Sequence, residues 1–89
     1  MDAKEALYVV CHNGVFVLPD KIFQTLSGQV RNGFLYLRQD DEVLTISTQR
    51  VVDGHRRALS PRFRVPMFRE AKKLAIVNLR ESLRVMIVS

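Results

Sequence analysis

The chain has 89 residues, of which 47% are apolar, and a net charge of +5. This length supports one small domain with a single core, and the composition has none of the Gly-, Pro- or Ser-rich tracts of a disordered or fibrous protein. Apolar runs of about six residues fall far short of the roughly 20 that cross a bilayer, and a single cysteine, Cys11, excludes an internal disulfide. We therefore expect one cytoplasmic domain over residues 1–89 that has no membrane partner.

The first half of the chain, residues 6–48, is expected to form two strands, a short helix and two more strands. Proline has no N–H to give to a sheet, so Pro19 ends the second strand and precedes the helix. Alternation then predicts inward-facing leucine and isoleucine side chains in the third and fourth strands. The expected elements are strands at 7–11 and 15–18 around the turn His12-Asn13-Gly14, a helix from Asp20 to Ser27-Gly28, and strands at 34–38 and 43–48 with Leu35, Leu37, Leu44 and Ile46 inward.

The second half, residues 49–89, repeats this order. Asp53-Gly54 is typical of a type I′ hairpin turn, and Pro66 follows a short strand as Pro19 does. The apolar residues after Pro66 recur at helical spacing. The expected elements are strands at 55–59 and 62–65, a helix with Met67, Phe68, Ala71 and Leu74 on its apolar face, and a final pair of strands that places Ile87 in the core.

Two segments carry this repetition, GVFVLPDKIF at 14–23 and PRFRVPMFREA at 61–71. Each has a short alternating strand, then a proline, then apolar residues at helical spacing. We therefore predict a mainly β fold with two short helices, a small closed β-barrel built from two β-β-α-β-β halves related by a pseudo-twofold axis. The half-repeats are residues 6–48 and 49–89, and the second is shorter around its helix and third strand.

Positive charge is concentrated in the second half. The ten basic residues of 49–89 accompany only three acidic ones, whereas acidic residues outnumber basic ones in 1–48. Such asymmetry attracts polyanions, of which nucleic acid is the most common.

The candidate nucleic-acid-binding residues follow from this charge. Phe63 and Val65 turn inward, so Arg62 and Arg64 share the exposed face of their strand. The preceding strand brings further arginines alongside, and the predicted helix adds a basic polar face. The full set is Arg56, Arg57, Arg62, Arg64, Arg69, Lys72 and Lys73. An ordinary solvated face and a surface for an acidic protein partner are the alternatives.

The chain offers little chemistry for an enzyme. Cys11 and His12 are neighbours that point to opposite faces of a strand, and Cys11 is expected in the core. For His55 there are two alternatives, a phosphate contact and an ordinary surface histidine. The run 40–42 is an acidic turn rather than a cation site. We expect no catalytic residue, metal or cofactor, and we expect core packing rather than a base-stacking platform for Tyr8, Phe34 and Tyr36.

The two proline-ended segments resemble the boxes of the cradle-loop barrel group, which includes the swapped-hairpin AbrB, MazE and MraZ-type DNA-binding domains and the RIFT barrels. That resemblance implies a transcriptional regulator. It transfers only to the second segment, because Val15 and Val17 stand where that segment has Arg62 and Arg64. Two boxes in one chain imply a monomeric pseudo-dimer. The alternative within the group is a RIFT-like barrel that binds a small ligand or an acidic protein.

Overall fold

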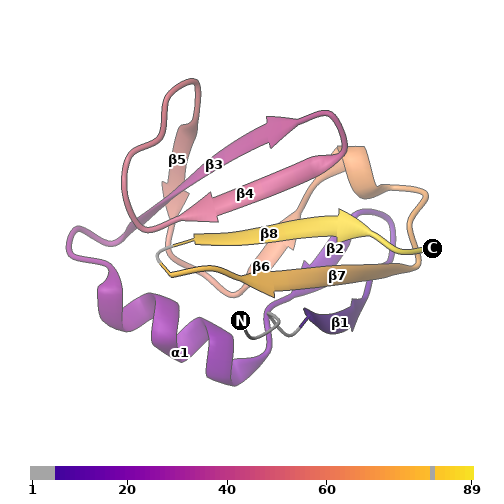
Figure 1. Cartoon of the computed structure of the whole chain (residues 1–89), viewed down its shortest axis with the longest axis horizontal. Coiled ribbons are helices and arrows are strands. Elements are labelled where there is room, and N and C mark those ends of the chain that lie inside the picture. Colours follow the sequence, from indigo (N-terminus) through magenta and orange to yellow (C-terminus); the bar gives the residue numbers. More distant parts are fainter. Residues whose placement is uncertain (1–5, 81) are drawn as a thin grey trace.

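The computed structural model describes residues 6–80 and 82–89 and is mainly β (Figure 1). Its strands are antiparallel throughout and form two sheets, accompanied by one α-helix and one turn of 3-10 helix. The elements are β1 (Ala6–Val10), β2 (Val15–Val17), α1 (Asp20–Gln29), β3 (Phe34–Asp40), β4 (Val43–Ser47), β5 (His55–Ala58), β6 (Arg62–Arg64), η1 (Pro66–Phe68), β7 (Lys73–Asn78) and β8 (Ser82–Ile87).

The larger sheet has six strands in the order β1-β7-β8-β4-β3-β5, and the smaller one pairs β2 with β6. The prediction of a closed barrel is wrong, because both sheets are open and β1 and β5 are the edges of the larger one among the described strands. The short strands β2 and β6 pair with each other through Phe16 and Phe63 and do not join those two edges. We refer to this pair of strands as the ribbon.

The strand order of the larger sheet is symmetric. If β1 is equated with β5, β2 with β6, β3 with β7 and β4 with β8, the order is the same from either edge. Two pairings join equivalent strands, and each places equivalent positions opposite one another. Phe16 faces Phe63 across the ribbon, and Thr45 faces Arg84 across β4 and β8. Residues 6–48 and 49–89 therefore have equivalent strand pairings, while duplication of an ancestral half stays a prediction.

The second predicted helix is wrong. The chain between β6 and β7 is much shorter than that between β2 and β3, and it forms only the single turn η1 (Figure 1). Phe68 and Ala71 are still buried in the core, which explains why their spacing predicted a helix. The connection between β6 and β7 is too short to form one. In the first half α1 is a true helix, with Ile22 and Leu26 buried on one side.

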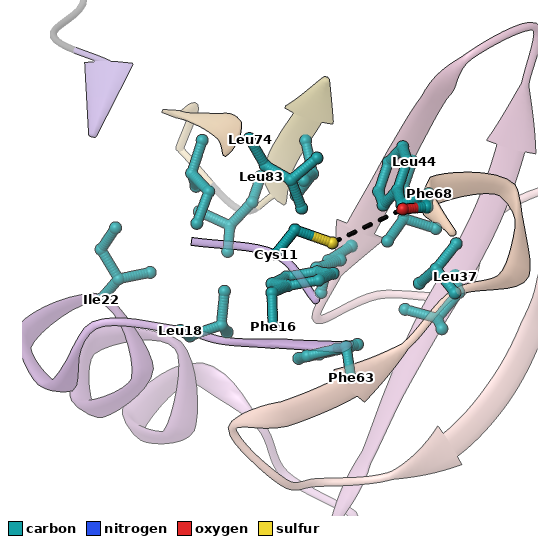
Figure 2. Close-up of a cluster of buried hydrophobic side chains, with 14 of the residues drawn as sticks. Cys11, Phe16, Leu18, Ile22, Leu37, Leu44, Phe63, Phe68, Leu74 and Leu83 are labelled. Carbon is teal, nitrogen blue, oxygen red and sulfur yellow. Dashed lines mark hydrogen bonds between the residues drawn. The ribbon is translucent and has the colours of Figure 1, made fainter. Parts of the chain in front are cut away.

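The core lies between the larger sheet, the ribbon and α1 (Figure 2). Alternation correctly placed the buried residues of β3 and β4, which are Leu35, Leu37, Leu44 and Ile46. At its centre the rings of Phe16 and Phe63 stack with centroids 5.4 Å apart, and Phe68 packs against Phe16 at 6.2 Å. Ile87, expected in the core, is 38% exposed at the end of β8.

Two turns were predicted from glycine together with asparagine or aspartate, one at 12–14 and one at 53–54. Asn13 and Gly14 both have positive φ, and His12 pairs with Val15, so the turn between β1 and β2 is confirmed. The Asp53-Gly54 hairpin is wrong: β4 and β5 each pair with β3 rather than with each other. Gly54 instead donates its N–H to the carbonyl of Val51 at 3.1 Å and closes a turn around Asp53.

Replacement by alanine should have opposite effects on the free energy of unfolding at two glycines. Gly14 has φ +80°, and an added Cβ would lie 2.6 Å from the carbonyl oxygen of Val65. We expect Gly14→Ala to lower the free energy of unfolding by about 2 kcal/mol or more, since left-handed backbone alone costs roughly 1–2 kcal/mol for an L-residue. Gly28 lies in α1, and a Cβ added there would have no neighbouring atom within 4 Å. Gly28→Ala should therefore raise the free energy of unfolding by about 0.5–1 kcal/mol. Urea unfolding of both variants measures the contrast, and equal effects would contradict the backbone conformation at residue 14.

Candidate nucleic-acid interface

The ribbon determines where Arg62 and Arg64 point. Phe63 is 2% exposed and faces the core, so its two neighbours in β6 lie on the outer side and are exposed. Across the ribbon, Val17 stands opposite Arg62 and Val15 opposite Arg64. The outer face of the ribbon is therefore apolar on one strand and basic on the other.

Arg57 lies on the core side of β5, and its guanidinium packs on the ring of Phe63 with a separation of 4.2 Å from the centroid. Its Nη2 donates to the carbonyl of Arg62 at 3.0 Å, and Nη1 donates to that of Ser60 at 3.5 Å. Burial lowers the pKa of this guanidinium from its ordinary value. Arg57 thus joins β5 to the start of β6 and positions Arg62.

These three arginines line one surface hollow of about 390 Å³, which we call the arginine hollow. Leu37, Ser60 and Phe63 complete its lining, and no carboxylate contributes to it. Within residues 6–80 and 82–89 the ion pair that we find joins Arg38 to Asp40, elsewhere on the protein. The positive charge of the hollow is therefore not neutralised by any described side chain.

The other predicted residues do not join this cluster. Arg56 lies on the opposite face of β5, where it packs over Phe34 at 4.4 Å. Lys73 begins β7 and lies over Tyr8 at 5.5 Å, near the far edge of the larger sheet. Arg69 and Lys72 are exposed in the segment after η1. The expectation that a helix carries Arg69, Lys72 and Lys73 on one polar face is wrong, because β7 begins where that helix was predicted.

The first half has an equivalent groove of different chemistry. It has a volume of about 600 Å³ and is lined by apolar residues of β1, β2 and the segment that leads to α1, together with Asp20. Arg57 corresponds by position to Val9, and the two arginines of β6 correspond to the valines of β2. We call it the valine groove; its lining comprises Val9, Val10, Val15, Phe16, Val17, Leu18, Pro19 and Asp20.

None of Cys11, His12 and His55 lines the arginine hollow or the valine groove. Cys11 is buried as predicted, its thiol donates to the carbonyl of Phe68 at 3.6 Å (Figure 2), and burial raises its pKa. His12 and His55 are exposed. The acidic turn follows β3 as expected, with Asp41 at positive φ. Among the described residues, no three or more His, Cys, Asp or Glu side chains are grouped so as to hold a metal ion.

The expectation of core packing is wrong for three aromatic residues, Tyr8, Phe34 and Tyr36. None belongs to the buried core, and Tyr8 is 60% exposed. Since Leu35 and Leu37 turn inward, alternation places Phe34 and Tyr36 on the outer face of β3, beside Arg56 of β5. A second hollow of about 400 Å³ opens there, lined by Tyr36, Arg50, Val51, Gly54 and Arg56. The sequence analysis left Arg50 out of the candidate set and assigned Tyr36 to the core, although the alternation of β3 places Tyr36 on the outer face.

Comparisons with family models, curated proteins and solved structures found no match to this chain. The resemblance to the cradle-loop group accordingly stays a prediction. In the part of the chain that the structure describes, α1 is the only α-helix, and it lacks the length and apolar character needed to cross a membrane.

Arg57 and Arg62 should differ in their effect on folding. Arg57→Ala removes the contact with Phe63 and leaves two carbonyls without their donor, so we expect the free energy of unfolding to fall by about 1–3 kcal/mol. Arg62→Ala alters an exposed side chain and should change it by no more than about 0.5 kcal/mol. Chemical denaturation of the two variants checks this, and an Arg57→Ala protein as stable as Arg62→Ala would show that Arg57 does not join β5 to β6.

Proposed function

We propose that the protein is a non-enzymatic module that binds nucleic acid, with its phosphates contacting the arginine hollow. The observation that carries the proposal is the gathering of Arg57, Arg62 and Arg64 around one hollow without a carboxylate in its lining. Arginines that lie close together without a carboxylate repel one another, and binding of a phosphate chain reduces that repulsion.

The geometry of β6 suits a repeating anion. Arg62 and Arg64 are two residues apart on one face of a strand, so their Cα atoms are separated by about 6.5–7 Å. Both are exposed, and no described carboxylate forms an ion pair with either. Each guanidinium can donate two parallel hydrogen bonds to phosphate oxygens. Neighbouring phosphates can therefore be neutralised together, and such contacts supply affinity without sequence preference.

Arg57 has a supporting part in this proposal. Its guanidinium is held by the main chain of Ser60 and Arg62, so its position does not depend on a ligand. A fixed positive charge at the base of the hollow lowers the cost of organising the site when a phosphate arrives. The role of a transcriptional regulator comes only from the resemblance of the second segment to AbrB-type boxes and is part of the proposal.

Replacing Arg62 and Arg64 together by Ala should weaken binding to a 12-mer oligonucleotide by about tenfold or more at low salt, because two charge-assisted contacts are lost. The slope of log affinity against log salt concentration should become shallower by about one to two units. Fluorescence anisotropy of a labelled oligonucleotide, measured from low to moderate salt, gives both quantities.

The matched control is the double variant Lys21→Ala with Arg84→Ala, which removes the same charge from α1 and β8. It should bind nearly as well as the unaltered protein. An equal loss in both variants would mean that only net charge matters, and no affinity of the unaltered protein for DNA or RNA at low salt would end the proposal. Binding of a polyglutamate chain in place of nucleic acid would instead assign the hollow to an acidic protein partner.

A further inference from the structure

Around β5, arginines lie on both sides of an edge strand. Arg57 faces the arginine hollow, whereas Arg56 faces the outer surface of the sheet together with Arg50 and Tyr36. We call this outer cavity, lined by Tyr36, Arg50, Val51, Gly54 and Arg56, the tyrosine hollow. Because Arg56 and Arg57 are consecutive residues of β5, the two cavities are lined from opposite faces of this edge strand, which pairs on one side with β3.

The aromatic wall of the tyrosine hollow is held in place by Asn32. The side-chain Nδ2 of Asn32 donates to the Tyr36 hydroxyl at 3.2 Å, and its Oδ1 accepts the N–H of Phe34 at the same distance. Gly33, at φ +81°, allows the tight turn that brings Asn32 alongside β3. The Tyr36 ring is thereby fixed, although it is only half buried.

Arg50 and Arg56 form the cationic wall. Arg56 packs over the Phe34 ring, with its guanidinium carbon 4.4 Å from the ring centroid. Arg50 is exposed and, with the described residues, makes no ion pair. No carboxylate lines the hollow. The site thus combines an aromatic face with two guanidinium groups in a cavity within the size range of small-ligand pockets, roughly 300–1,000 Å³.

We infer that the tyrosine hollow takes an unpaired nucleobase that stacks on Tyr36 while Arg50 and Arg56 contact the flanking phosphates. A strand that lies in the arginine hollow can continue across the free edge of β5 and place a base here. Bases of a duplex are paired and stacked inside the helix and cannot enter such a cavity, so the nucleic acid is single-stranded. This inference rests on the proposed function and specifies its substrate class.

The test compares a 12-nucleotide deoxythymidine strand with a 12-base-pair DNA duplex at equal salt. The single strand should bind more tightly to the unaltered protein. Tyr36→Leu should weaken single-strand binding by roughly 5- to 100-fold, the range found for loss of one stacked base, and should leave duplex binding unchanged. Tyr36→Phe keeps the ring and should bind almost normally. Tyr8→Leu, at the opposite edge of the sheet, is the control and should have no effect.

Intrinsic fluorescence gives a second readout, since the chain has two tyrosines and no tryptophan. The oligonucleotide should quench emission of the Tyr8→Phe protein, which reports Tyr36 alone, and should leave that of the Tyr36→Phe protein unquenched. Both variants keep an aromatic ring at the substituted position.

The outcomes separate the two proposals. If the Arg62 and Arg64 variant loses affinity while Tyr36→Leu is silent and Tyr36 emission is unquenched, the stacking inference is overturned and the proposed function stands. Equal affinity for duplex and single strand would likewise overturn it. Failure to bind either oligonucleotide would remove the proposed function and the inference together.

Discussion

The contact between Phe16 and Phe63 is the interaction on which the rest of the structure depends. The two rings stack at 5.4 Å with only 11° between their planes, and both are almost fully buried. They are the central pair of the ribbon and contribute the largest side chains that β2 and β6 give to the core. A ribbon of two three-residue strands is not stable by itself, so this buried pair holds it against the larger sheet. The orientation of every neighbouring side chain in the ribbon follows from it.

The same contact determines the chemistry of the surface. With Phe63 inward, Arg62 and Arg64 face outward, and the guanidinium of Arg57 packs over the Phe63 ring. At the equivalent place beside Phe16 the first half has valines. Two equivalent strand arrangements thus present an apolar groove in one half and a basic hollow in the other. Four of the ten basic residues of 49–89 lie on β5 and β6, whereas others such as Lys73 in β7 and Arg84 in β8 lie away from these strands.

The strands could be predicted well from the sequence, because alternation in segments such as 34–40 depends on short-range geometry. The order β-β-α-β-β of the first half and the burial of Cys11 were also accessible in this way. Barrel closure and the Asp53-Gly54 hairpin were wrong because strand partners are chosen by long-range packing, which no local pattern encodes. The second helix was wrong because the connection between β6 and β7 is too short, although its apolar spacing is helical.

The candidate site was predicted in part. Arg62 and Arg64 follow directly from alternation around Phe63. The distinction between Arg56 and Arg57 does not, since it depends on which ring each guanidinium meets, Phe34 on the outer face or Phe63 beneath. Arg50 lies between strands, where no periodicity positions a side chain, and only the folded turn that leads to Gly54 brings it to the tyrosine hollow.

The central claim is that one of two equivalent surfaces binds nucleic acid and the other does not. Backbone amide shifts measured by NMR during titration with a single-stranded oligonucleotide test this claim most directly, because both surfaces are observed in the same sample. The account predicts that shifts are concentrated at Arg50, Arg56, Arg62 and Arg64, while the amides of Val9, Val10 and Val17 in the valine groove stay in place. Shifts centred on the valine groove, or shifts of similar size in both halves, would contradict it.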